Sequence, residues 1–414
     1  MQKYDAIIVG AGIAGLTAAK HLDQYKLNVC LLEKDERPGG RVKTDEKEGF
    51  RFDRGFQVLL TAYPAVRKYL NLEALDLRSF EPGARCFNLK QNFVVSDTKR
   101  KPWSLPRMAL SPVGTFMDKI KLGNLRAEIM AKTNEEIFDA PDITTIDYLR
   151  QRGFSDKIIE RFWRPFYGGI FLETDLRTSA RMFEFVFKMF AQGDAAVPAR
   201  GIEAIPLQMA KSLKNVDQRY NAEVDRIETG QVTLKDGSQI EAPQIIVATE
   251  AQRFFDQVAG RDRWNSTTQY YFAAPKAPFS EKLIALQYRE QGLVNNLAVM
   301  TQLSKEYAPQ GQHLIQVSLQ RHPDDHQESV IRRIKDELAV TFGNEVQNWA
   351  FLRSYRIEKA LPILDQPAYD NEMNETLLRD GLYLAGDHQT NASLNGAMLS
   401  GEAAARFLVL NHAT

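Results

Sequence analysis

The glycine-rich start of the chain restricts its fold more than any other feature. A strand-like run that begins near Tyr4 is followed by Gly10, Gly12 and Gly15, which have the spacing GxGxxG. Apolar residues at helical spacing come next, and a second apolar run ends at Glu33. This order predicts a strand, a tight turn, a helix and a second strand, with the glycines admitting a pyrophosphate to the helix N-terminus. Because a carboxylate at the end of the second strand can accept hydrogen bonds from a ribose, we expect a dinucleotide site.

The composition is that of an ordinary globular protein. With 414 residues, 44% of them hydrophobic and 26% charged, we expect two or three domains with a sizeable core. The 53 basic and 53 acidic residues give a net charge of 0, so charge provides no argument for a nucleic-acid partner. Two cysteines, Cys30 and Cys86, are too few for a disulfide framework and favour a reducing, cytoplasmic compartment. We expect no signal peptide before the first strand and no membrane-spanning helix.

A second glycine turn distinguishes this chain from a domain that binds only NAD. The stretch ERPGGRVKT places Gly39, Gly40 and Arg41 shortly after Glu33. Two further stretches are FRFDRGFQVL at 50–59 and LAGD…SLNGAMLSG near the C-terminus. In this combination the chain resembles the superfamily of flavin-containing amine oxidases, phytoene desaturases and protoporphyrinogen oxidases. The resemblance covers both ends of the chain and parts of its middle.

The resemblance implies an α/β fold in which a Rossmann-like FAD-binding domain, of the p-hydroxybenzoate hydroxylase and amine oxidase type, carries a discontinuous α+β substrate domain. FAD then lies extended. The implied FAD-binding residues at the first βαβ unit and the second turn are Gly10, Gly12, Ile13, Ala14, Gly15, Glu33, Lys34, Gly39, Gly40 and Arg41, with Val224 beside the adenine. Those near the C-terminus are Gly386 and Asp387 at the phosphates or ribityl chain, and Leu394, Asn395 and Ala397 at the flavin edge.

The small residues near the C-terminus are open to two interpretations. If a helix starts near Gly396, its free N–H groups point at the flavin edge, and small side chains at Gly396 and Ala397 let the backbone approach an aromatic ring system. The other interpretation is a helix of small residues packed tightly on a sheet.

Changes of pattern along the chain predict the domain boundaries. Residues 220–251 show three short strands and then a further apolar strand, which is expected to return to the first domain. By contrast, 79–195 is rich in helical and aromatic patterns, and 264–319 alternates like an antiparallel sheet. The expected FAD-binding domain comprises 1–78, 196–258 and 355–414, and the expected substrate domain comprises 79–195 and 259–354.

The substrate region resembles desaturases and protoporphyrinogen oxidases over residues 161–205. Phe183, Phe187 and Phe190 have helical spacing, which is typical of a core, although their place in the family favours a cavity wall. Gly168 and Gly169 follow an aromatic segment rather than a strand, so we expect a single dinucleotide site. The partner is therefore expected to be an apolar small molecule.

We assign no metal-binding or catalytic role to the other candidate residues. His322 and His326 flank Pro323 and two aspartates, which predicts a solvated helix start rather than a metal site. Lys282 is interpreted as a surface lysine, not as the water-holding lysine of amine oxidases. The chain has no GxSxG and no CxxC, so no catalytic residue is assigned. Ser393 stands where monoamine oxidases place an aromatic ring of their amine cage.

The resemblance implies an FAD-dependent oxidoreductase that transfers a hydride from a C–C bond of a bulky apolar substrate to flavin N5. The alternatives are a flavin amine or amino-acid oxidase and a non-catalytic protein of the same fold that binds prenylated GTPases. The complete glycine motifs argue against the latter. The basic stretch KRKPWSLPR at 99–107 is interpreted as a solvated loop, with a peripheral membrane contact through Trp103 as the alternative.

The FAD is expected to be bound without a covalent bond, because no cysteine lies between residues 355 and 400. Purified protein should be yellow, and acid precipitation should release the flavin into the supernatant, where its absorbance is measured. Flavin that stays with the precipitated chain would contradict this, and a colourless protein that FAD cannot reconstitute would contradict the cofactor itself.

Overall fold

The N-terminal unit forms the centre of a six-stranded sheet. The computed structural model describes residues 4–255, 263–288, 292–370, 376–379 and 381–412. β1 (Ala6–Val9) pairs in parallel with β2 (Val29–Leu32) and β14 (Gln244–Val247), and all three strands are buried apart from one residue. Strands covered on both faces are continuously apolar, which is why these runs do not alternate. The order is β10-β2-β1-β14-β21-β20, with β10 (Val216–Arg219), β21 (Leu382–Leu384) and β20 (Leu377–Arg379).

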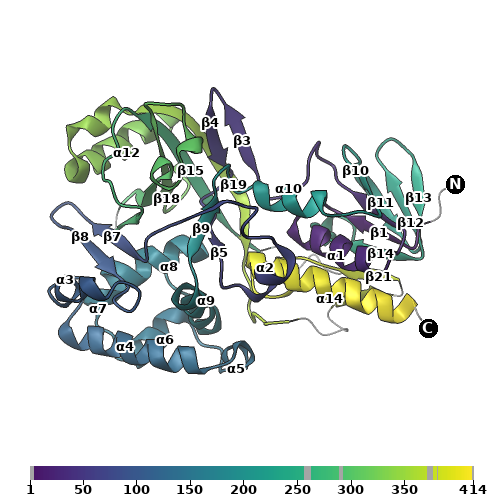
Figure 1. Cartoon of the computed structure of the whole chain (residues 1–414), viewed down its shortest axis with the longest axis horizontal. Coiled ribbons are helices and arrows are strands. Elements are labelled where there is room, and N and C mark those ends of the chain that lie inside the picture. The colour runs from purple at the N-terminus through teal and green to yellow at the C-terminus, as the bar shows by residue number, and fades with distance from the viewer. Residues whose placement is uncertain (1–3, 256–262, 289–291, 371–375, 380, 413–414) are drawn as a thin grey trace.

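Two layers cover this sheet (Figure 1). On one face lie α1 (Ile13–Gln24), α10 (Ala204–Lys211) and α14 (Leu394–His412), whose apolar side chains share a core with Ile8 and Leu31. On the other face lies a small sheet whose core includes Ile7 and Cys30. It consists of β11 (Val224–Glu228), β12 (Gln231–Leu234) and β13 (Gln239–Glu241).

A second sheet has seven strands in the order β19-β15-β18-β17-β16-β7-β8. Its neighbours are antiparallel except for β16 and β7. Helix α12 (Gln327–Phe342) covers one face through Val330, Ile334 and Leu338, which repeat at helical spacing. The strands are β7 (Gly83–Phe87), β8 (Asn92–Ser96), β15 (Trp264–Ala274), β16 (Ile284–Gln287), β17 (Val294–Val299), β18 (His313–Leu319) and β19 (Ala350–Pro362).

The helices of the second part lie at the end of the molecule away from both termini (Figure 1). Capping boxes start two of them, at Thr115 with Asp118 and at Thr133 with Glu136. The helices are α3 (Leu105–Ala109), α4 (Phe116–Ala131), α5 (Asn134–Phe138), α6 (Thr145–Gln151), α7 (Asp156–Ile158), the π-helical turn Ile159–Trp163, α8 (Arg164–Phe171) and α9 (Ala180–Gln192).

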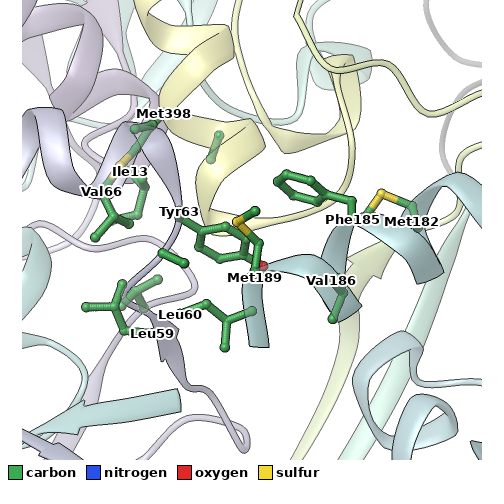
Figure 2. Close-up of a cluster of buried hydrophobic side chains, with 14 of the residues drawn as sticks. Ile13, Leu59, Leu60, Tyr63, Val66, Met182, Phe185, Val186, Met189 and Met398 are labelled. Carbon is green, nitrogen blue, oxygen red and sulfur yellow. The ribbon is translucent and has the colours of Figure 1, made fainter. Parts of the chain in front are cut away.

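Shorter elements connect the two parts of the chain. β9 (Ala195–Pro198) pairs with β5 (Leu59–Leu60) and β6 (Leu77–Ser79). Apart from short 3-10 helices, the other described elements are the hairpin of β3 (Thr44–Lys47) and β4 (Phe50–Asp53), and the helices α2 (Pro64–Tyr69) and α11 (Met300–Leu303). The junction beneath these connections is apolar: Tyr63 stacks on Phe185 of α9 with ring centroids 5.7 Å apart (Figure 2).

One of the predicted domain boundaries falls within a strand. β19 crosses residue 355, so this strand contributes to both of the expected domains, and the boundary at 258 and 259 lies outside the described residues. α12 begins at Gln327, with His326 as its N-cap residue, a few residues after the helix start expected at Pro323. Across the described ranges, no three His, Cys, Asp or Glu residues gather as metal ligands. Nor does any described helix have the length and hydrophobicity needed to cross a membrane.

The small residues of α14 allow close packing. A Cβ atom on Gly401 would lie 2.1 Å from the carbonyl oxygen of Ala14 in α1, and one on Gly396 would lie 2.4 Å from the hydroxyl of Thr390. The tight-packing interpretation therefore holds for these two glycines, which touch α1 and a loop. The helix begins at Leu394 rather than near Gly396, since the Ser393 hydroxyl accepts the Gly396 N–H at 2.9 Å.

Gly401→Ala should destabilise the protein by about 1–3 kcal/mol, because the backbone of α1 cannot move away without opening the core. A matched control is Gly123→Ala in α4, where a Cβ meets nothing within 4 Å and should leave stability unchanged or raise it by up to about 1 kcal/mol. Thermal denaturation measures both. Equal melting temperatures for the two variants would refute the packing role of Gly401.

Candidate functional site

A cavity of about 1320 Å³ runs between the six-stranded and seven-stranded sheets. One arm, which we call the glycine arm, passes the turn between β1 and α1. The other, the aromatic arm, is enclosed by α4, α8 and α9. The chemistry of the two arms differs.

Two glycine turns form the wall of the glycine arm. The Gly39 N–H donates to the Ala11 carbonyl at 2.9 Å, which joins the second turn to the first. A Cβ on Gly40 would lie 3.3 Å from the Cα of Gly12, whereas one on Gly12 would meet nothing within 4 Å and would extend into open space. A side chain at Gly12 would thus occupy the room beside the N-terminus of α1, where an anionic group is favoured.

Glu33 is fixed at the end of β2 with 5% of its surface exposed. Its Oε2 accepts the Ala11 N–H at 2.8 Å and its Oε1 accepts the Asp35 N–H at 3.0 Å. Each carboxylate oxygen retains a further lone pair that can accept a hydroxyl hydrogen. A ribose fits this acceptor, and the open space at Gly12 fits a pyrophosphate.

An ion pair joins the second glycine turn to the C-terminal motif across the cavity. Arg41 Nη2 lies 2.5 Å from Asp387 Oδ1, and Asp387 is buried. The guanidinium also donates to the Ala360 carbonyl at 3.0 Å and lies 5.1 Å from the ring centroid of Trp264. Two predicted motifs that are 346 residues apart therefore meet at one point.

All but two of the predicted FAD-binding residues line the cavity. A Cβ on Gly15 would lie 1.9 Å from the Gly10 carbonyl oxygen, so Gly15 serves the packing of helix on turn. Asn395 is fully buried, and its side-chain oxygen accepts the Ala65 N–H at 3.1 Å. The predicted residues that do line the cavity are Gly10, Gly12, Ile13, Ala14, Glu33, Lys34, Gly39, Gly40, Arg41, Val224, Gly386, Asp387, Leu394 and Ala397.

A charged cluster in the cavity wall was not predicted. Asp45 lies 2.9 Å from Arg54 and 3.7 Å from Arg353, and it accepts the Tyr355 hydroxyl at 2.6 Å. Burial alone would raise the pKa of Asp45, but hydrogen bonds from Arg54 and Tyr355 hold it well below its usual value. The stretch FRFDRGFQVL contained a signal, since residues 54–58 all line the cavity, but its pattern did not show which side chains face inward.

The aromatic arm contains two of the three predicted phenylalanines. Phe187 and Phe190 line it, whereas Phe183 is fully buried in the core behind them. The ring centroids of Phe166 lie 5.3 Å from those of both Phe162 and Phe190, which makes a continuous apolar surface. Gly168 and Gly169 lie within α8 and line the same arm, in a helix rather than in a nucleotide loop.

A set of polar strand residues, which we call the polar wall, also lines the cavity, and it too was not predicted. Gln269 Oε1 accepts the Ser318 hydroxyl at 2.8 Å, and Asn295 Nδ2 donates to the Pro165 carbonyl at 3.3 Å. Asn296 Oδ1 is buried without a hydrogen-bond partner among the described residues. The sequence predicted these strands, but not which of their faces borders the cavity.

Two acids near the aromatic arm have basic partners. Asp97 lies 2.8 Å from Arg126, and a hydrogen bond from Lys101 lowers the pKa of Glu81. Lys282 is exposed and does not line the cavity, which confirms its interpretation as a surface lysine. Neither Asp97 nor Glu81 is therefore free to bind a cationic substrate.

Sequence comparison finds a family model described as "Flavin containing amine oxidoreductase", which matches residues 13–409. Protoporphyrinogen oxidase 2 of Arabidopsis thaliana is 29% identical over 39% of this chain and 31% of its own length. The chain thus spans less than a third of that relative. The 15-cis-phytoene desaturase of Narcissus pseudonarcissus is 20% identical over 99% of this chain and 80% of its own.

Comparison with solved structures confirms the predicted fold class. An oxidoreductase from Methanosarcina mazei aligns with a TM-score of 0.76 at 18% identity, over 96% of this chain and 98% of that one. Putrescine oxidase bound to putrescine aligns with a TM-score of 0.69 at 15% identity, over 99% of both chains. At these identities the likeness concerns the fold alone.

Replacing Glu33 should weaken FAD binding. Glu33→Gln removes a charge-assisted hydrogen bond, which is worth about 1.5–3 kcal/mol, so the dissociation constant of FAD should rise about ten- to a hundredfold. Fluorescence titration of the apoprotein with FAD measures it. Glu241→Gln on the exposed strand β13 is the control and should bind as the parent does. An unchanged dissociation constant for Glu33→Gln would remove this residue from the cofactor site.

Proposed function

Because the chain belongs to the flavin containing amine oxidoreductase family, as its motifs predicted, we propose that it oxidises a bulky, mainly apolar substrate at a C–C bond. The cofactor is FAD, which when bound would supply the acceptor for a hydride from the substrate, and the substrate would release the accompanying proton to solvent. The observation that carries the proposal is the aromatic arm. Family membership makes the chain an oxidoreductase, so the non-catalytic alternative is set aside.

The aromatic arm suits a large hydrocarbon because its affinity would come from buried area. Apolar contact is worth about 25 cal/mol per Å² before the costs of association are subtracted. Phe162, Phe166 and Phe190 supply rings along one side, with Ile170 and Val186 also in the lining. These side chains exclude water and fix the orientation of the substrate.

The polar wall restricts where a polar group of the substrate can lie. Asn296 has an unused acceptor, and Gln269 is held by the Ser318 hydroxyl, so an amide surface is fixed in the cavity wall. A substrate with few polar atoms would place them here and its hydrocarbon part against the rings. We assign these amides to orientation and assign no general acid or base.

An amine or amino-acid oxidase is the competing function. Against it stands Ser393, which lines the cavity. The sequence resemblance implies that monoamine oxidases have an aromatic ring of their amine cage at this position. Its hydroxyl is committed to the backbone N–H of Gly396 and to Asn391, at 2.9 and 2.6 Å. Near the aromatic arm, Asp97 is already paired with Arg126.

Anaerobic mixing tests the two functions directly. We expect the flavin absorbance to bleach with a polyene or a porphyrinogen and to persist with small primary amines and L-amino acids. Rapid bleaching by a small amine would overturn the proposal and establish the amine oxidase instead.

A variant of the aromatic arm adds a second readout. Phe190→Ala should raise the substrate concentration for half-maximal bleaching about tenfold or more, since a buried phenylalanine contributes about 1.5–3 kcal/mol. Phe342→Ala on α12 removes a comparable, partly buried ring from the opposite side of the second sheet and should leave that concentration unchanged. Equal effects of the two variants would contradict the assignment of the arm to substrate.

A further inference from the structure

Large apolar side chains gather on the surface between residues 103 and 120. Trp103 is 77% exposed, Leu110 is 88% exposed and Phe116 is 72% exposed. Leu105, Met117 and Ile120 are exposed as well, and we call these six side chains the rim patch. Elsewhere in the described part of the chain, exposed large apolar side chains are scattered along the sequence. A concentrated patch of this kind marks an interaction surface.

The local sequence explains why the rim patch has no intramolecular partner. Prolines at 102, 106 and 112 interrupt this stretch, so that α3 has only five residues. α4 then starts at the capping box of Thr115 and buries Leu125 and Ile129 farther along the helix. Its first turns instead present Phe116 and Ile120 to the surface.

The rim patch is continuous with the aromatic arm. Leu105, Phe116 and Ile120 are exposed and also line the cavity, and the buried Met108 lines it beneath them. α3 and α4 lie at the end of the molecule farthest from the two termini (Figure 1). An object that covers this surface would therefore face the entrance of the aromatic arm.

The chain segment that carries the rim patch is basic. Residues 99–121 contain one acid, Asp118, which is buried in the capping box. Arg100 and Lys101 are paired with Asp194 and Glu81. The other basic residues of the stretch are Lys99, Arg107, Lys119 and Lys121, and no carboxylate within salt-bridge distance is recorded for them in the described structure.

We propose that the rim patch docks the enzyme on an anionic lipid bilayer. Trp103, Leu110 and Phe116 would enter the interface between headgroups and acyl chains, while the basic side chains meet the anionic headgroups. An apolar substrate dissolved in the bilayer would then pass from the acyl chains into the aromatic arm. The docking stands by itself, and the passage of substrate rests on the proposed function.

Charge favours a lipid surface over a second copy of the chain. A two-fold symmetric contact would bring the same basic residues of two subunits together, which is unfavourable. A bilayer that contains anionic lipid supplies the opposite charge and an apolar layer directly beneath it. The basic side chains then have anionic partners, and the apolar side chains leave water.

Vesicle flotation of the FAD-loaded protein tests the docking. The protein should float with phosphatidylcholine vesicles that contain phosphatidylglycerol, less with pure phosphatidylcholine, and less again at high salt. The apolar double variant Trp103→Ser with Leu110→Ser, two exposed side chains that do not line the cavity, should lose at least ten times in affinity for the anionic vesicles. The charge variant Lys99→Glu with Arg107→Glu should lose a similar factor. Val340→Ser, which removes a 58% exposed side chain on α12, is the control and should bind as the parent does.

Three results would overturn the docking. The first is that the parent fails to bind anionic vesicles at low salt. The second is that the apolar double variant binds them as well as the parent does. The third is a concentration-dependent dimer in sedimentation that the apolar double variant abolishes. Unchanged flavin absorbance and melting temperature show that the variants remain folded. Passage of substrate from the bilayer is tested separately from docking. The flavin of the apolar double variant should be reduced more slowly than that of the parent with substrate in vesicles, but at the parent rate with substrate in detergent. If vesicles bind and no polyene or porphyrinogen reduces the flavin, the docking stands and the proposed substrate class fails.

Discussion

The close approach of α14 to α1 is the contact on which the rest of the structure depends. Gly401 brings its helix against the backbone of Ala14 in the first turn of α1, where no side chain would fit. This contact fixes the C-terminal segment beside the glycine turn and so brings Asp387 to Arg41. Without it, the glycine arm would lack one wall.

The division of the cavity into two arms follows from the chemistry of the groups that line them. The glycine arm presents backbone N–H groups, the carboxylate of Glu33 and the guanidinium of Arg41, which suit a charged and hydroxylated molecule. The aromatic arm contains phenylalanine rings, and side-chain amides also line the cavity. Where the arms meet, a bound substrate would exclude water, and electrostatic interactions with the protein would strengthen accordingly.

The sequence predicted those features whose structure depends on short stretches of chain. The glycine spacing predicted β1, α1 and most of the glycine arm, because backbone conformation there is set by a few neighbouring residues. It could not separate Phe183 from Phe187 and Phe190, since helical spacing identifies a shared face but not whether the core or a cavity lies against it. The polar wall and most of the rim patch went unpredicted for the same reason: each depends on which segment, distant in sequence, packs beside it.

The ion pair between Arg41 and Asp387 also sets an order of events during biosynthesis. Its two residues are 346 positions apart, so the ribosome must make most of the chain between the first partner and the second. The early βαβ unit can fold while translation continues, but one wall of its cavity arrives only with the late segment. A chain that stops before Asp387 would therefore lack one wall of the cavity, and cofactor loading would have to wait for the later segment.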